Sequence, residues 1–190
     1  DWIDQAILSS DSPQMIEEGC RYGLPSIFER PMHLSNDRAS AMDVCSHALF
    51  EAERYFRKVF DFVLYLEPTS PFRRPRHIER IARKLIEGNY DHVLSVSPTD
   101  SKSHPLKQFV LNDKGKFSFY DEHGKHVIAR QQLKTTYHRN GVAYAFSRRV
   151  FDVGDGFEWE KWTTEIIDEQ VVNIDTFFDL KLARFLWDHD

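Results

Sequence analysis

The apolar residues in the first half of the chain form short runs, separated by segments whose apolar positions have helical spacing. The run Phe62–Leu66 is apolar on both faces, which is typical of a central parallel strand. The predicted strands are Ile7–Leu8, Ser26–Phe28, Phe62–Leu66 and His92–Val96. The predicted helices run from Pro13 to Gly23, from about Ala39 to Arg57, and from about Ile78 to Gly88. Alternating strands and helices predict βαβ units and a largely parallel sheet with helices on both faces.

The pattern changes between Pro98 and Arg139. Phe109–Leu111 and Phe117–Phe119 flank the turn residues 112–115, which predicts a hairpin and an antiparallel excursion from the main sheet. The predicted strands then resume at Val142–Phe146 and end at Val171–Ile174. A Thr176–Asp179 capping box opens a C-terminal helix. The predicted buried residues of that helix are Leu180, Ala183, Phe185 or Leu186, and Trp187.

Together these elements predict one α/β domain over residues 1–190, a three-layer α/β/α arrangement with a mostly parallel, Rossmann-like sheet. Because the first residues run almost at once into an apolar segment, we expect the domain to lack its first strand.

The amino-acid composition limits the kinds of partner and the cellular compartment that we expect for this protein. A formal net charge of -5 argues against nucleic acid as the main partner, because binding to phosphate backbones needs a basic excess. No apolar stretch approaches the length of about 20 residues that spans a membrane, so we expect no membrane partner. Cys20 and Cys45 lack metal-type spacing and lie among apolar residues, which predicts buried free thiols and a reducing, cytoplasmic location.

Ligands of such sheets bind beyond the carboxyl ends of the strands, and four loops qualify. The first loop contains Arg30, Asp37, Ala39 and Ser40. Its arginine suits an anion, and the N–H groups that open the following helix favour negative charge. The alternative is that Asp37 only caps that helix.

The second loop is Glu67, Pro68, Thr69, Ser70 and Pro71, followed closely by Arg73. Its two prolines stiffen the backbone and hold the two hydroxyl groups at a fixed place at the sheet edge. The alternative is an ordinary connection between a strand and a helix.

The third loop region combines Arg130 and Gln131 with Asn140, Gly141 and Tyr144. Arg130 suits a carboxylate ligand, since a guanidinium group can bind it through two parallel hydrogen bonds. The alternative is that Asn140 and Gly141 form only a turn and that Tyr144 belongs to the core.

The fourth loop contains Asn173 and Asp175, after the last predicted strand. A carboxylate at that position suits Mg²⁺, a hard cation that prefers carboxylate and phosphate oxygens. The alternative is that Asp175 caps the last helix, although Thr176 is already a good cap.

In this order, the four loops resemble those of the acylneuraminate cytidylyltransferases, the CMP-sialic acid synthetases. The matching segments are Ser9-Ser10-Asp11, Arg30-Pro31 to Asp37, Glu67-Pro68-Thr69-Ser70-Pro71, Arg130-Gln131, Asn140-Gly141 to Tyr144, and Asn173-Ile174-Asp175-Thr176 with Asp179-Leu180. The resemblance covers essentially the whole chain.

The resemblance implies a homodimeric enzyme in which the anomeric hydroxyl of an acidic nine-carbon sugar attacks the α-phosphate of CTP, with Mg²⁺ as cofactor. It assigns the metal to Asp175 and Asn173, with Asp175 and Arg130 as the catalytic pair. The residues that would border the nucleotide are Arg30, Asp37, Ala39, Ser40, Glu67, Pro68, Thr69 and Ser70. The residues that would border the sugar are Arg130, Gln131, Asn140, Gly141 and Tyr144.

The chain departs from the family pattern at three places. Family members begin with a Gly- and Ser-rich loop that carries Arg and Lys for the triphosphate, and this chain lacks it, so we expect the chain as given to be nearly inactive. Gln is common where Glu67 stands, and an ionised carboxylate accepts hydrogen bonds but cannot donate them. Asp is common where Asn173 stands, which removes one charge from the metal site.

Several functions stay open at this point. The sugar can be a sialic, legionaminic or pseudaminic acid, or a keto-deoxy-octonic acid. A non-catalytic module that kept the fold is the alternative from another class. A glycosyltransferase would carry an acidic pair, joined by one residue, after a central strand, whereas the segment 173–175 offers one carboxylate.

Overall fold

The computed structural model describes residues 2–36, 38–152 and 158–189, which form two compact units. The first unit comprises residues 1–65 and 146–157, and the second comprises residues 66–145 and 158–190. The single domain expected from the sequence stays a prediction, and each unit is described by itself.

The first unit is built around a long helix. Its elements are α1 (Pro13–Arg21), η1 (Met32–Leu34), α2 (Ala41–Phe56), β1 (Phe62–Tyr65), the end of β5 (Tyr137–Ser147) and α4 (Arg149–Asp152). Helix α2 buries Cys45, Leu49 and Ala52, whose spacing of four and three residues places them on one face. Ser40 caps this helix by accepting a hydrogen bond from the backbone N–H of Asp43.

Two short strands expected in the first unit are absent from its described residues. Residues 7–8 and 26–28 are irregular, and Ser12 caps α1. Two backbone hydrogen bonds join the segments, from Leu8 N to the Pro25 carbonyl (2.9 Å) and from Arg30 N to the Ser10 carbonyl (3.0 Å). Pro25 has no N–H to give, so a regular ladder does not form around it.

The expected strand at Phe62–Leu66 is confirmed as β1, one residue shorter. None of its four residues is buried, and Phe62 is exposed. The expectation of a strand covered on both faces is therefore wrong, because an apolar run predicts a strand but does not say what covers it.

The second unit contains a mixed sheet with the order β5-β2-β6. Its elements are α3 (Pro75–Glu87), β2 (His92–Pro98), η2 (Pro105–Lys107), β3 (Phe109–Leu111), β4 (Phe117–Phe119), η3 (Glu122–His126), η4 (Arg130–Gln132), β5, η5 (Trp159–Lys161), β6 (Trp162–Ile166) and α5 (Phe177–Trp187). Strands β2 and β6 run parallel. Strand β5 runs antiparallel to β2, since Thr99 N bonds the Thr136 carbonyl whereas Ser95 Oγ meets Ala143 N.

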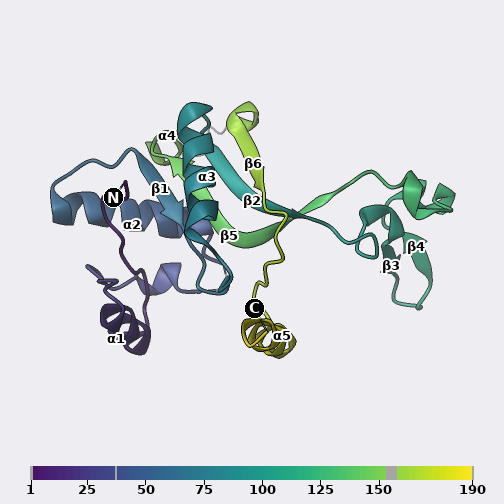
Figure 1. The fold of residues 1–190 in the computed structure, drawn as a ribbon, viewed down its shortest axis with the longest axis horizontal. Helices are drawn as coiled ribbons and strands as arrows, with labels where there is room; N and C mark the ends of the chain where they lie inside the picture. Colours follow the sequence, from purple (N-terminus) through teal and green to yellow (C-terminus); the bar gives the residue numbers. More distant parts are fainter. Residues whose placement is uncertain (1, 37, 153–157, 190) are drawn as a thin grey trace. The chain divides into compact units, whose positions relative to one another are not determined.

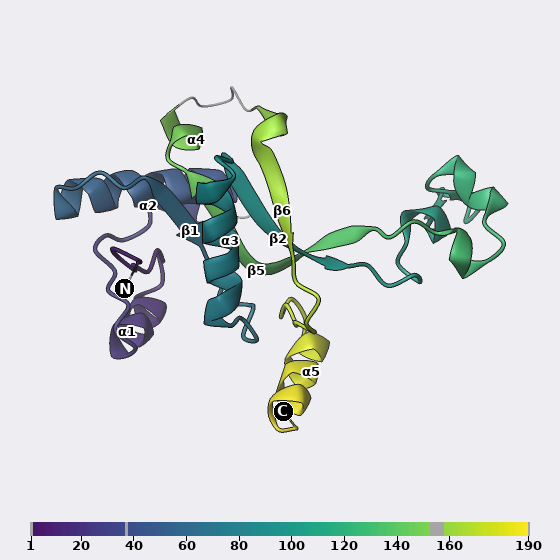
Figure 2. The same ribbon diagram turned by 45° about the horizontal axis from the view of Figure 1, so that its top comes forward.

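Helix α3 covers this sheet along β2 and β6 (Figures 1 and 2). Its side chains Ile81 and Leu85 are completely buried, and so is Val93 beneath the helix on β2. Burial of such side chains supplies the main stabilising free energy of this unit, about 1.5–3 kcal/mol for each one.

The excursion between β2 and β5 is confirmed. The chain leaves the sheet after β2, forms the antiparallel hairpin β3–β4, and returns at β5 (Figure 1). Gly115 takes a φ of 71° in the hairpin turn, and Asn112 Oδ1 accepts hydrogen bonds from Lys114 N and Lys116 N (both 3.0 Å). A turn with positive φ favours glycine, which is why the sequence pattern predicts it correctly.

The expected last strand, Val171–Ile174, is wrong. This segment is irregular, and the last strand is Trp162–Ile166, which pairs in register with β2 from His92 to Val96. The Thr176–Asp179 capping box and the helix that follows it are confirmed. Helix α5 buries only Ala183, whereas Phe185 and Trp187 are exposed, so the expected apolar face is not covered within the described chain.

The two cysteines differ in their exposure to solvent. Cys45 is buried, as expected, and burial raises the pKa of its thiol to about 12, but Cys20 is exposed. Among the described residues, no helix has the length and apolar character that crossing a membrane requires.

Candidate functional site

The loop 67–73, which leads into α3, is fixed at both ends by backbone contacts. Its Thr69 carbonyl accepts a hydrogen bond from Ile174 N (2.8 Å), so the loop lies against the segment that carries Asn173 and Asp175. Ser70 is buried within the loop, and its N–H bonds the Glu67 carbonyl (3.4 Å). The second and fourth predicted loops therefore meet.

Arg73 joins this loop to β5. Its guanidinium group donates to the Glu67 carbonyl (2.6 Å), to the Gly141 carbonyl (3.3 Å) and to the Val142 carbonyl. Burial lowers the pKa of Arg73, and the nearby Glu67 carboxylate opposes that effect. Since three main-chain carbonyls satisfy this half-buried cation, its role in the described structure is to hold the loop.

Gly141 marks the point where the loops converge. Its φ is 70°, and a Cβ atom there would lie 2.9 Å from Asn173 Oδ1 and 2.9 Å from Glu67 Oε2. A side chain at this position would therefore collide with both groups. Glycine is needed here for its conformation and for the close approach of two polar side chains.

The segment after β6 presents Asn173 and Asp175. The Asn173 amide donates from Nδ2 to Asp175 Oδ2 (2.9 Å), while its Oδ1 is buried and has no hydrogen-bond partner in the described structure. Thr176 caps α5, and Asp179 closes the capping box, so Asp175 is not the cap. The alternative that Asp175 caps α5 is therefore wrong. Its exposed carboxylate accepts a hydrogen bond from Asn173 instead.

Charged groups shift the ionisation of this cluster. The pKa of Glu67 is raised by burial and by the charge of Asp175, whereas Arg73 and Arg139 oppose the shift. The pKa of Tyr144 is raised by burial and by the charge of Glu67. Tyr144 is half-buried, its ring stacks on that of His92, and its role at the site stays a prediction.

Asn140 lies one residue before the point of convergence and is buried. Its Nδ2 donates to Ser97 Oγ (2.9 Å), and Ser97 in turn donates to the Ile167 carbonyl (3.1 Å). Its Oδ1 accepts from Val142 N (3.2 Å). These bonds tie β5, the end of β2 and the segment after β6 together, which fixes the backbone of Gly141.

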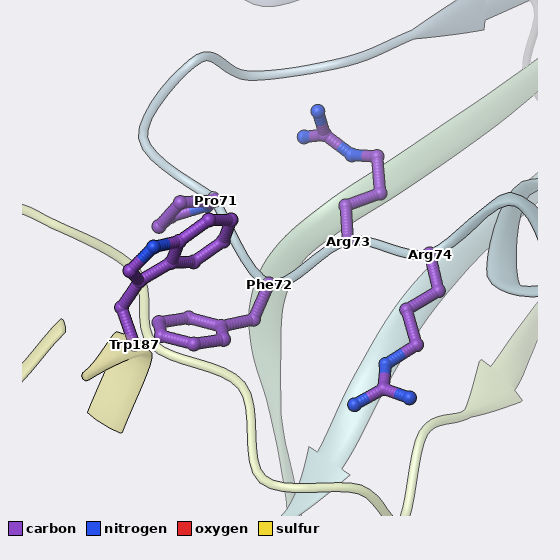
Figure 3. Close-up of a pocket in the computed structure, with 5 residues that line it drawn as sticks. All are labelled: Pro71, Phe72, Arg73, Arg74 and Trp187. Carbon is purple, nitrogen blue, oxygen red and sulfur yellow. The ribbon is translucent and has the colours of Figure 1, made fainter. Parts of the chain in front are cut away.

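A shallow pocket lies beside the loop, on its way into α3 (Figure 3). It is lined by Pro71, Phe72, Arg73, Arg74 and Trp187. The Phe72 and Trp187 rings lie together with centroids 6.4 Å apart, and the guanidinium groups of Arg73 and Arg74 point in different directions. The pocket offers an apolar wall rather than a joint anion site.

Sequence relatives cover nearly the whole chain, although no family model matches it. A pseudaminic acid cytidylyltransferase of Campylobacter jejuni is 27% identical over 188 residues, which is 97% of this chain and 78% of the relative. An N-acylneuraminate cytidylyltransferase of Escherichia coli is 28% identical over 184 residues, which is 95% of this chain and 41% of the relative. The chain is therefore a distant homologue, over nearly its full length, of cytidylyltransferases of the acylneuraminate type.

A solved structure shares the fold of this chain. The CMP:2-keto-3-deoxy-manno-octonic acid synthetase, solved with CTP, matches with a TM-score of 0.66 and 15% identity over 98% of this chain and 82% of that chain. The fold is therefore an α/β fold like that of this synthetase, with a mixed sheet and a small hairpin. The predicted fold class is confirmed at this level, while the mostly parallel sheet of the prediction is mixed in the second unit.

The family resemblance also assigned Arg130 and Gln131 to the site. The structure places both on η4, inside the excursion, where the Arg130 carbonyl accepts from Leu133 N. None of the contacts described around Glu67, Gly141 and Asn173 includes either residue. Their proposed roles stay predictions.

The nucleotide-side residues of the first loop lie in the first unit. Arg30 donates to Asp11 Oδ1 and to Ser35 Oγ (both 3.2 Å), so its guanidinium group already holds the loop together. Ala39 immediately precedes the α2 cap, Ser40. Asp37 lies outside the described residues.

Two arginines belong to the site but were not assigned to it from the sequence. Arg73 was noted only for its position after the loop, and Arg139 was not noted, although its charge acts on Glu67 and Tyr144. The available signal was their position: Arg73 follows the Pro-Thr-Ser-Pro loop, and Arg139 directly precedes Asn140-Gly141.

Proposed function

We propose that this protein is a cytidylyltransferase that couples CTP to an acidic nonulosonic sugar. The anomeric hydroxyl oxygen of the sugar attacks the α-phosphorus of CTP, the bond from that phosphorus to the bridging oxygen breaks, and pyrophosphate leaves with the electron pair. The observation that carries the proposal is the approach of Glu67 and Asn173 to Gly141, with Asp175 bonded to Asn173, in a chain similar to such enzymes.

Mg²⁺ fits this cluster. The donor set consists of hard oxygen ligands, and one of them, Asn173 Oδ1, is a buried acceptor without a donor. Among the described residues no three His, Cys, Asp or Glu side chains gather as a metal cage, but Mg²⁺ usually takes only one or two carboxylates beside water and phosphate oxygens. Asp175 and Asn173 would hold the ion, which would offset the triphosphate charge.

The remaining residues of the cluster position the reactants. Arg73 and the Thr69–Ile174 hydrogen bond hold the loop 67–73 against the metal-side segment, so that nucleotide and sugar meet a fixed surface. Glu67, Pro68, Thr69 and Ser70 would border the nucleotide, whereas Asn140, Gly141 and Tyr144 would border the sugar. A homodimer and a cytoplasmic location remain predictions.

The decisive measurement is Mg²⁺-dependent release of pyrophosphate from CTP by the full-length protein, with a panel of sialic, legionaminic, pseudaminic and keto-deoxy-octonic acids. Release with one sugar alone would establish the reaction and its substrate. If the folded protein binds CTP but releases no pyrophosphate with any of these sugars, the non-catalytic binding module becomes the better description.

Arg130 provides a test of the sugar side. Replacing it by alanine is expected to raise the KM for the acidic sugar by about tenfold or more, because a charge-assisted bond to a carboxylate contributes about 1.5–3 kcal/mol. The KM for CTP should change little. Steady-state kinetics with each substrate varied in turn measures both values, and equal increases would contradict the assignment.

A further inference from the structure

The carboxylate of Glu67 and the amide of Asn173 approach the same point of the backbone. Each places an oxygen 2.9 Å from the position that a Cβ of Gly141 would take. An ionised carboxylate and an amide oxygen are both acceptors. Two acceptors close to one point are stabilised by a proton or a cation held between them.

The Asn173 amide cannot satisfy both of its acidic neighbours. Its Nδ2 donates to Asp175 Oδ2, which turns Oδ1 away from Asp175 and leaves it buried without a donor. If the amide were turned by 180°, its NH₂ group would face away from Asp175, and Oδ1 would then oppose that carboxylate. One amide between two carboxylates therefore always leaves one acceptor pair without a donor.

The charges of Arg73 and Arg139 act on Glu67, but no hydrogen bond described for this part of the chain joins either arginine to Glu67 Oε2 or to Asn173 Oδ1. The guanidinium group of Arg73 donates to main-chain carbonyls, and the described hydrogen bonds of Asn173 include no other donor. The two groups are also held in place, because Arg73 bonds the Glu67 carbonyl and Thr69 bonds Ile174. The contact is thus built into the backbone, and a divalent cation is the partner that suits it.

We propose that Glu67 is a direct ligand of the divalent cation held by Asp175, and that Asn173 contributes its amide oxygen to the same ion. This inference rests on the proposed function. In the family pattern the carboxylate stands at the position of Asn173 and the amide at the position of Glu67. Here the two groups are exchanged across Gly141, so the number of carboxylates beside the metal is preserved.

The test measures binding of Mn²⁺, as a probe for Mg²⁺, by electron paramagnetic resonance of the free ion, with full-length protein in the presence of CTP. The variants are Glu67→Gln, Asp175→Asn and the exchange variant Glu67→Gln/Asn173→Asp. The matched control is Glu79→Gln, an exposed carboxylate on α3 that pairs with Arg83. Circular dichroism shows that each variant is folded.

Glu67→Gln is expected to weaken Mn²⁺ binding by at least about tenfold, since even outer-shell partners of metal ligands are worth 10–100-fold. The exchange variant should regain most of that affinity, and Glu79→Gln should match the parent. If Glu67→Gln binds Mn²⁺ like the parent while Asp175→Asn does not, Glu67 only shares a proton with Asn173, and this inference fails alone. If the folded parent binds no Mn²⁺, the metal site of the proposed function fails with it.

Discussion

Replacing Asp175 by alanine is expected to abolish pyrophosphate release from CTP while the protein stays folded. Asp175 is exposed and does not cap α5, so its loss should cost little stability. Its carboxylate is the charged oxygen ligand that the segment 173–175 offers. Removing one group that stabilises transition-state charge typically lowers kcat by about 10²–10³-fold, and loss of the metal should cost at least that much.

The measurement compares kcat over a range of Mg²⁺ concentrations for the parent, for Asp175→Ala and for a control, Asp113→Ala. Asp113 is an exposed aspartate in the turn of the β3–β4 hairpin, so its removal changes the net charge equally without touching the site. Near-normal turnover by Asp175→Ala would refute the metal assignment.

Gly141→Ala is expected to remove most activity at a moderate cost in stability. The new methyl group would stand 2.9 Å from both Glu67 Oε2 and Asn173 Oδ1, so the two groups must separate. The positive φ adds strain of about 1–3 kcal/mol. Activity and thermal unfolding of the same samples measure the two effects separately.

Gly115→Ala is the matched control for this variant. Gly115 has nearly the same φ, 71°, but a Cβ atom there would meet nothing within 4 Å. Gly115→Ala should therefore show the loss of stability without the loss of activity. Should both variants keep full activity, the close approach at Gly141 would have no catalytic importance.

The sequence predicts correctly those elements that depend on hydrogen bonds between residues close together in the chain. The Thr176–Asp179 capping box and the hairpin turn at Asn112–Gly115 depend on hydrogen bonds between near neighbours, and both are confirmed. The prediction of the last strand is wrong because a strand depends on a partner that is distant in the sequence. Trp162–Ile166 mixes polar and apolar residues and becomes a strand because β2 offers it a partner. The segment 171–174, rich in β-branched residues, instead bonds the backbone of Thr69 through Ile174 N and forms no strand.

The candidate site was predictable in its parts but not in its geometry. The sequence placed Glu67, Asn173 and Gly141 in three separate loops, and only the fold shows that they meet at one point. The family resemblance places Arg130 at the site, and that role stays a prediction, whereas the described contacts of Gly141 include Arg73. Long-range contacts of this kind leave no periodic pattern in the sequence.

In the described part of the chain, the hydrogen bonds of the Arg73 guanidinium group go to main-chain carbonyls, which every amino acid carries. The position of the loop is thus insensitive to mutation of the side chains that it presents. Evolution can therefore replace the side chains of the loop one at a time while Arg73 continues to hold its backbone. Such an attachment suits a chain that shares only 27% identity over 188 residues with a relative.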